Sequence, residues 1–278
     1  MYRFLRPLRW LQNQLHGLSL PLTCRRLAVQ REAEVYGSTS ENWQKIRGLE
    51  MMSLLDLRNG QRVLDLGCGT GELTVELARR VGHRGRVIGL DLNKGRIEVA
   101  QRKFGDCGNI DFVAGTNDAV EKYQLLDRIF CSFVIYWIED QRKCFQQLFE
   151  ALRPGGLFGI IGVTASPLFF HKLTKIMAGA SAELNELMGW HFRTEEGWIG
   201  LANETGFRVL SSDQYVAYNI HPSVEHLLLW WEATTSGKCL VEKVVDEELD
   251  DLLDEFEYSR NGCIDVRENI IRIVMQKP

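Results

Sequence analysis

The chain has 278 residues, enough for one or two domains around a large hydrophobic core. Hydrophobic residues make up 45% of it and charged residues 25%, as in ordinary globular proteins, and the net charge of −4 gives no reason to expect a nucleic acid as partner. No apolar stretch reaches the roughly 18 to 20 residues of a membrane-spanning helix, so no integral membrane contact is expected. The seven cysteines include no C-x-x-C pair and no compact Cys/His cluster, which favours free thiols over disulfides and argues against a structural zinc site.

The first 31 residues form a basic segment. Six arginines and no acidic residue occur in it, and five leucines share one helical face: Leu5, Leu8, Leu11, Leu15 and Leu18. An acid-poor, arginine-rich amphipathic segment is typical of a transit peptide, so we expect a mitochondrial or else a cytoplasmic location. A helical arm packed on the domain and a helix at a membrane surface are the alternatives.

Strand and helix patterns alternate through the middle of the chain. Helical patterns cover residues 42–57, 72–80, 93–104 and 141–152, with Asn93 as an N-cap and Pro154-Gly155-Gly156 as the end of the last helix. Apolar strand patterns begin at Val63 and cover residues 86–91, 110–114, 128–133 and 157–163. This alternation predicts an α/β fold with helices on both faces of a parallel sheet.

The pattern changes after Val163. Residues 164–206 are typical of several helices, 207–218 of a strand, 222–256 of about two helices and 270–275 of a last strand. We therefore expect residues 32–278 to form a single domain with a lid made by the insertions 164–206 and 219–266. Six large apolar residues in the lid region favour an apolar substrate: Phe169, Phe170, Met177, Met188, Trp190 and Trp198.

A glycine-rich turn follows the first strand. Asp65 ends the apolar run, Gly67, Gly69 and Gly71 alternate after it, and a helix begins at Glu72. The glycines let the backbone approach a ligand, and the free N–H groups of the helix start attract a polar or anionic group. Asp91, at the end of the next strand, can accept both hydroxyls of a ribose. The G-x-G-x-G spacing differs from the G-x-G-x-x-G of dinucleotide-binding folds.

With Leu152-Arg153-Pro154-Gly155-Gly156 downstream, these residues resemble the class I S-adenosylmethionine-dependent methyltransferases over residues 42–163. The resemblance implies a Rossmann-like, seven-stranded sheet that is parallel except for an antiparallel last strand, with S-adenosyl-L-methionine as cofactor and no metal. The cofactor-binding residues that it implies are Asp65, Gly67, Cys68, Gly69, Gly71, Asp91, Leu92, Asp118 and Ser132. A nicotinamide-binding Rossmann domain is the alternative.

The segment from Ser132 to Arg142 resembles a narrower group, the juvenile hormone acid methyltransferases, and more loosely the trans-aconitate methyltransferases. In the first group a glutamine and a tryptophan hold the substrate carboxylate, and those roles fall on Gln44 and Trp137. Two departures concern the substrate: Tyr136 replaces the usual histidine, and Asn42-Trp43-Gln44 is one residue tighter than usual.

These features predict O-methylation of the carboxylate of a small apolar acid by a monomer or homodimer. An ionised carboxylate needs no base, whereas a hydroxyl or amine acceptor would, and His171 or His191 could then serve. The alternatives are C-, N- or O-methylation of another metabolite, and a non-catalytic methyltransferase-like domain that binds a protein partner.

Overall fold

Seven strands form one mixed sheet in a computed structural model that describes residues 43–278. The strand order is β3-β2-β1-β4-β5-β7-β6, and the strands are β1 (Arg62–Leu66), β2 (Arg86–Asp91), β3 (Ile110–Ala114), β4 (Leu126–Ser132), β5 (Leu152–Val163), β6 (Arg208–His221) and β7 (Ile264–Gln276). β1 to β5 are parallel, and β7 lies antiparallel between β5 and β6. The predicted fold, including the antiparallel last strand, is confirmed. The predicted transit-like segment, residues 1–31, lies outside the described residues.

Helices cover the sheet and build a lid beside it. A helix over residues 43–54, α3 (Glu72–Val81), α4 (Lys94–Phe104), α5 (Gln141–Ala151) and α8 (Glu195–Glu204) accompany the sheet, with short 3₁₀ helices η2 (Asn117–Lys122) and η3 (Ile135–Trp137). The lid holds α6 (Leu168–Ala178), α7 (Leu184–Met188), α9 (Val224–Thr234), η4 (Val241–Lys243) and α10 (Asp246–Glu255). Asn93 caps α4 as predicted, because its Oδ1 accepts the N–H groups of Gly95 and Arg96.

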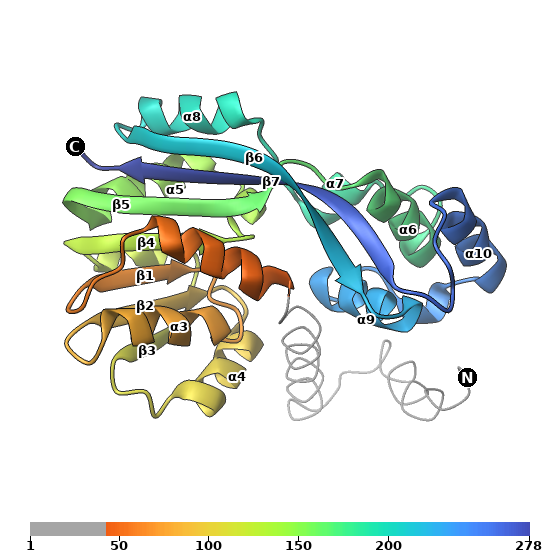
Figure 1. Cartoon of the computed structure of the whole chain (residues 1–278), viewed down its shortest axis with the longest axis horizontal. Coiled ribbons are helices and arrows are strands. Elements are labelled where there is room, and N and C mark those ends of the chain that lie inside the picture. The colour runs from red at the N-terminus through yellow and green to blue at the C-terminus, as the bar shows by residue number, and fades with distance from the viewer. Residues whose placement is uncertain (1–42) are drawn as a thin grey trace.

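Two hydrophobic cores divide the molecule between the sheet and the lid. The first surrounds the sheet, and the second gathers residues of α6, α9 and α10 with Ile264 and Val266 of β7. β5 pairs with β7 as far as Val163 and Ile270, but β6 and β7 stay paired beyond that point as far as His221 and Ile264. The two strands therefore run longer than the predicted 207–218 and 270–275. Their extension forms a two-stranded ribbon that reaches into the lid (Figure 1).

One prediction about the later elements is wrong. Trp198, expected in the lid region, lies on α8 in the sheet core and stacks on Phe145 at 6.0 Å between ring centroids. α8 therefore belongs to the sheet rather than to the lid. The helix predicted over residues 141–152 is α5, which ends at Ala151. Pro154-Gly155-Gly156 follows it within β5, where the Gly155 N–H donates to the carbonyl of Lys277 at 2.8 Å.

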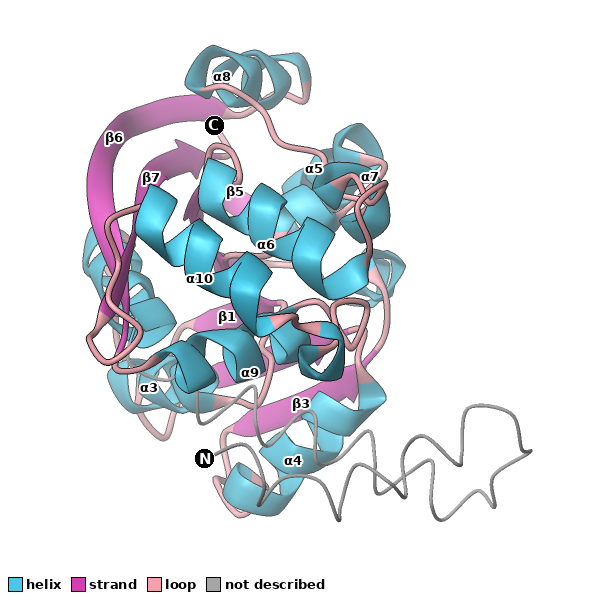
Figure 2. Ribbon diagram, turned by 90° about the vertical axis from the view of Figure 1, so that its right-hand side faces the viewer, coloured by secondary structure: helices cyan, strands magenta, loops and turns pink. Residues whose placement is uncertain are grey.

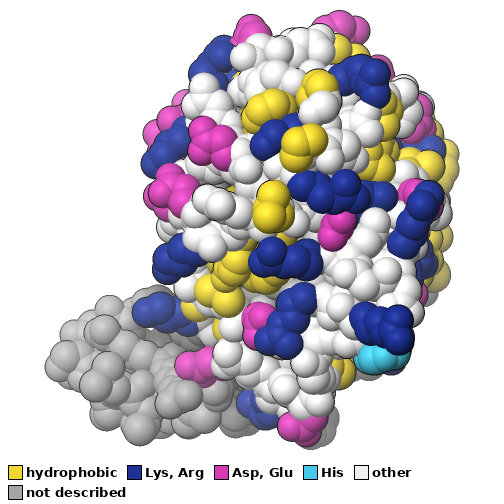
Figure 3. All heavy atoms as spheres, turned by 90° about the vertical axis from the view of Figure 1, so that its left-hand side faces the viewer, with side chains coloured by type: hydrophobic (Ala, Val, Ile, Leu, Met, Phe, Trp, Pro, Cys, Tyr) yellow, Lys and Arg dark blue, Asp and Glu magenta, His cyan; other side chains and the backbone are white. Residues whose placement is uncertain are grey.

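The carboxyl ends of the parallel strands point towards the lid (Figure 1), and seen from the lid side α6, α9 and α10 lie across that edge of the sheet (Figure 2). On the opposite end of the molecule, basic, acidic and apolar side chains are interspersed (Figure 3). Within residues 43–278 no helix is long and apolar enough to cross a membrane. The same residues contain no group of three or more His, Cys, Asp or Glu side chains that could hold a metal ion.

Candidate functional site

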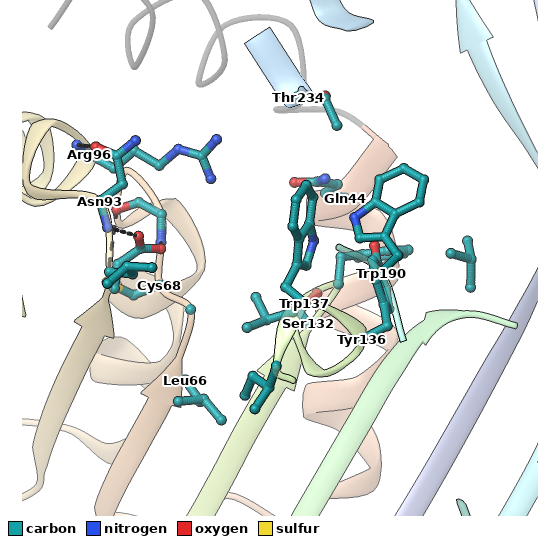
Figure 4. A pocket seen from close by; sticks show the side chains of 18 of the residues that line it. Gln44, Leu66, Cys68, Asn93, Arg96, Ser132, Tyr136, Trp137, Trp190 and Thr234 are labelled. Atoms are coloured by element: carbon teal, nitrogen blue, oxygen red, sulfur yellow. Dashed lines mark hydrogen bonds between the residues drawn. The ribbon is translucent and has the colours of Figure 1, made fainter. Parts of the chain in front are cut away.

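A large pocket lies at the carboxyl edge of the sheet, between the sheet and the lid (Figure 4). Its volume of about 850 Å³ is near the upper end of the roughly 300–1,000 Å³ typical of small-molecule sites. Residues that follow β1, β2, β3 and β4 line one end, and aromatic residues of the lid line the other. One end of the pocket is therefore polar, as a nucleoside site would be, and the other end is apolar. The pocket is large enough for two ligands to meet in it.

The glycine turn is built by left-handed backbone and by hydrogen bonds to β2. Gly67, Gly69 and Gly71 have φ angles of 79°, 56° and 92°, a region that favours glycine. The Gly67 N–H donates to the carbonyl of Leu90 at 2.7 Å, and the Gly69 N–H donates to Asp91 Oδ2 at 2.9 Å. Asp91 Oδ1 accepts the Asn93 N–H at 2.8 Å. Two backbone donors thus fix the Asp91 carboxylate beside the turn at the pocket wall.

Gly67 and Gly71 are required by different packing contacts. A Cβ atom on Gly67 would lie 2.1 Å from Cγ2 of Val134, so this glycine is required by protein packing as well as by its φ angle. Gly71 does not line the pocket: it is the N-cap of α3, and a Cβ atom there would meet the Phe112 ring at 2.9 Å. Glycine at this position is required for close packing of α3 on the neighbouring elements, and contact of Gly71 with the cofactor stays a prediction.

Asp65 and Cys68 line the pocket but are nearly buried. The Thr74 hydroxyl donates to Asp65 Oδ2 at 2.6 Å, and burial, with a smaller effect of the Asp91 charge, raises the pKa of Asp65 to about 7. Burial also raises the pKa of the Cys68 thiol well above its ordinary value. Because the thiolate is the reactive form, burial makes the Cys68 thiol less reactive, which favours a small packing residue over a redox group.

The remaining predicted cofactor residues lie around the same end of the pocket. Leu92 is 71% exposed, and Ser132 ends β4 with a buried hydroxyl that has no partner within residues 43–278. Asp118 Oδ1 accepts Lys143 Nζ at 2.8 Å and Gln147 Nε2 at 2.9 Å, so α5 engages this carboxylate. Sequence reasoning missed further polar residues that line this end: Asn93, Arg96, Thr116, Asn117 and Lys143. Figure 4 shows Arg96 reaching from α4 towards the middle of the pocket.

Gln44 and Trp137, the two predicted substrate residues, both line the pocket. Figure 4 shows them side by side, although one comes from the helix over residues 43–54 and the other from η3. The Trp137 ring is 37% exposed and meets the Trp190 ring edge-on at 5.2 Å between centroids. His171 and His191, considered as bases, do not line the pocket.

The motif around Trp137 also positions the lid segment that carries Trp190. The Tyr136 carbonyl accepts the His191 N–H at 2.7 Å, and the Gln141 side chain donates to the His191 carbonyl at 2.7 Å. Gln141 Oε1 in turn accepts Arg193 Nε at 2.5 Å. Tyr136 and Gln141 therefore hold residues 190–193 against the sheet edge.

Phe133 adopts a backbone conformation that is rare for a bulky residue. Its φ angle of 58° lies in the left-handed region directly after β4. Its N–H donates to the carbonyl of Ile161 at 2.8 Å, and its ring packs on Trp43 at 4.7 Å. Such conformations concentrate at functional sites, which agrees with the position of Phe133 on the pocket wall.

The lid end of the pocket is aromatic and contains one buried acid. Phe170 of α6 stacks on Trp231 of α9 at 4.3 Å, and Trp190 and Trp230 also line this end. Glu268 of β7 is 5% exposed, and burial raises its pKa to about 7. Sequence reasoning missed Glu268.

Residues 63–156 match a protein family described as "Methyltransferase domain". The ubiquinone/menaquinone biosynthesis C-methyltransferase UbiE of Vibrio vulnificus is 35% identical over 136 residues, which are 48% of this chain and 52% of that protein. The chain thus spans about half the length of this curated relative.

A demethylmenaquinone methyltransferase of Staphylococcus saprophyticus is 32% identical over 186 residues, which are 60% of this chain and 77% of that protein. Among solved structures, phosphoethanolamine N-methyltransferase 2 of Haemonchus contortus in complex with S-adenosyl-L-methionine has a TM-score of 0.57 at 19% identity, covering 90% of this chain and 57% of that one. The last likeness is one of fold.

Proposed function

We propose, from the premise that the chain belongs to the class I S-adenosylmethionine-dependent methyltransferases, that it transfers a methyl group from S-adenosylmethionine to a small, apolar, uncharged molecule. The single observation that carries the proposal is the pocket itself, which joins the Asp91 end to the aromatic lid end in one cavity. A cofactor held at one end can there meet an acceptor held at the other.

The cofactor end fits S-adenosylmethionine by the chemistry of its donors and acceptors. The Asp91 carboxylate uses two of its roughly four lone-pair sites for Gly69 and Asn93, so further acceptor capacity is left for ribose hydroxyls. Asn117 and Thr116 add polar groups at the same end. When bound, S-adenosylmethionine supplies a methyl group already activated on a sulfonium.

The acceptor end favours an apolar ligand. Phe170, Trp230 and Trp231 provide flat apolar surface, and Trp137 and Trp190 line the pocket as well. Figure 4 shows Trp137 and Trp190 across the pocket from Asn93 and Arg96. These rings exclude water and hold the reacting atom of the acceptor near the roughly 3 Å approach distance that transfer requires. The geometry supplies positioning rather than a nucleophile.

An uncharged acceptor is better supported than the carboxylate expected from the juvenile hormone acid methyltransferase resemblance. The described basic residues that line the pocket are Lys45, Arg96 and Lys143, and none of them is buried. No buried positive charge is therefore present among them to pair with a carboxylate. A carboxylate buried at the lid end would instead face the carboxyl group of Glu268, and like charges in a low-dielectric site repel. The names of the Vibrio and Staphylococcus relatives, a C-methyltransferase and a demethylmenaquinone methyltransferase, also support an uncharged acceptor.

The proposal is tested by following labelled methyl groups from S-adenosylmethionine into a small panel of acceptors. We expect label in uncharged hydroxyl-bearing ring compounds and none in apolar carboxylic acids or amines. The matched control is Asp91→Ala, which should lose transfer to every acceptor through loss of cofactor binding. Labelling of an acid alone, abolished by Gln44→Ala, would restore the carboxylate hypothesis and refute the uncharged acceptor.

A further inference from the structure

An acidic side chain occupies an apolar position of the β6–β7 ribbon. Buried and exposed residues alternate along β7, and the buried row runs Ile264, Val266, Glu268 and Ile270. Three of these four residues are apolar and belong to the two hydrophobic cores. Burying a carboxyl group in such a row destabilises the fold unless the group is neutral or paired. Packing alone would favour an apolar residue at position 268, so it does not explain why a glutamate is there.

The sheet topology brings Glu268 to the carboxyl edge of the sheet, where the pocket lies. Pairing of β5 with β7 ends at Val163 and Ile270, and Thr164 donates its N–H to the carbonyl of Asn269 at 3.1 Å. Glu268 therefore lies just past the carboxyl end of β5, on the strand next to it. Its side chain lines the same pocket as the glycine turn and Trp137.

The surroundings of Glu268 leave its carboxyl group free to exchange a proton. Among the described residues, Asn219 of β6 donates the one hydrogen bond that Glu268 accepts, to Oε1 at 3.1 Å. The other titratable group on that buried face of the ribbon is His221, which pairs with His226 of α9 at 3.1 Å between Nδ1 atoms. Burial lowers the pKa of His221 to about 3, so it brings no positive charge near neutrality.

Buried polar atoms without partners around the pocket favour a ligand that carries hydrogen-bond acceptors. Four polar atoms that belong to pocket-lining residues are buried without a partner in the described part of the chain: Ser132 Oγ, Ser166 Oγ, Trp190 Nε1 and Thr234 Oγ1. An indole N–H can only donate, so Trp190 is satisfied only by an acceptor atom. Figure 4 shows its nitrogen edge turned towards Gln44 and Trp137. An ammonium group offers no acceptor, whereas a phenol, enol or ketone does.

We propose that Glu268 is the general base of the site and that the methyl acceptor carries a phenolic or enolic hydroxyl. This inference rests on the proposed function. The acceptor O–H bond breaks, its electron pair stays on the acceptor oxygen, and the proton forms a new O–H bond on the Glu268 carboxylate. The negative charge left on the acceptor spreads from oxygen to the conjugated carbon, so either atom becomes a nucleophile. Methylation of an uncharged acceptor releases one proton, and Glu268 receives it, whereas a carboxylate acceptor would release none.

The proton transfer can be observed without methyl transfer. The probe is 4-nitrophenol, whose ionised form absorbs visible light, bound to the full chain in the presence of S-adenosylhomocysteine. In the wild type we expect the bound probe to ionise at neutral pH. In Glu268→Gln its apparent pKa should fall by at least about one unit, a tenfold change in its ionisation equilibrium, because the neutral amide removes the negative charge that opposes ionisation of the probe. Asp265→Asn, an acid-to-amide change at an exposed position of the same strand, is the matched control and should behave as the wild type.

A kinetic measurement separates a base from a structural acid. With any hydroxyl acceptor that the labelling panel identifies, Glu268→Gln should lower kcat by roughly 10²- to 10⁴-fold with little change in KM, and Glu268→Asp should recover part of the loss. Unchanged calorimetric binding of S-adenosylhomocysteine would show that the variant is folded.

Failure of the wild type to bind S-adenosylhomocysteine would refute the proposed function. If the wild type binds it and the probe, but Glu268→Gln leaves the probe's ionisation and kcat unchanged, only the role of Glu268 is refuted. A wild type that binds S-adenosylhomocysteine but not 4-nitrophenol would overturn the hydroxyl class of acceptor.

Discussion

Replacing Glu268 by glutamine should stabilise the protein at alkaline pH. Burial raises the pKa of this carboxyl group from 4.5 to about 7, a change of roughly 2.5 units. At about 1.36 kcal/mol per unit, the ionised side chain costs the folded state about 3 kcal/mol relative to the unfolded state. Glutamine keeps the shape of the side chain and an oxygen for the Asn219 amide, but it cannot ionise.

The sign of the pH dependence follows from the direction of the pKa change. Below pH 4.5 the carboxyl group is protonated in both states, and its contribution to stability is fully present. As the pH rises from 4.5 through 7, the unfolded state releases its proton first, and this contribution is lost. Asp65 titrates in the same way in both proteins and cancels in the difference.

Urea unfolding at pH 5 and pH 8 measures this difference. The quantity to compare is the free energy of unfolding of Glu268→Gln minus that of the wild type. We expect this difference to be larger at pH 8 than at pH 5 by about 2–3 kcal/mol. Asp265→Asn should show no such change. A difference between Glu268→Gln and wild type that is independent of pH would mean that Glu268 is not buried as a titrating acid, and the argument for a base would lose its support.

Three further changes test other parts of the account. Gly67→Ala should lower stability by about 1–3 kcal/mol because its Cβ atom would meet Val134, and Val134→Ala in the same chain should recover part of that loss in urea unfolding. Trp190→Phe keeps a ring beside Trp137 but removes the indole donor, so acceptor KM should rise by roughly 5- to 10-fold while calorimetric binding of S-adenosylmethionine stays unchanged. Residues 1–31 fused to a fluorescent reporter should carry it to mitochondria, and a diffuse reporter would reject the transit-peptide hypothesis.

The sequence predicted the part of the fold that local patterns determine. The apolar strand before Gly67, the N-cap at Asn93 and the acid at the end of β2 are short-range signals, and the structure has each of them in place. The same signals located one end of the pocket. Gln44 and Trp137, 93 positions apart in the chain, were paired only through a family resemblance, and both line the pocket.

Contacts between distant segments were beyond such patterns. Helical spacing at Trp198 could not tell that α8 packs on α5 rather than on the lid. The requirement for glycine at position 67 comes from Val134, which is distant in sequence. One feature of the sequence could have indicated Glu268, since an acid stands there at an apolar position of an alternating strand. Its place in the pocket, however, depends on where β5 ends beside β7.

The central claim, that the glycine turn and Asp91 form a site for S-adenosylmethionine, is tested most directly by calorimetry on the full chain. We expect S-adenosylmethionine to bind with micromolar affinity and NAD not to bind. Asp91→Ala should weaken S-adenosylmethionine binding by roughly 10- to 150-fold, the equivalent of a charged hydrogen bond worth about 1.5–3 kcal/mol. Binding of NAD without S-adenosylmethionine, or an Asp91→Ala variant with wild-type affinity, would contradict the account.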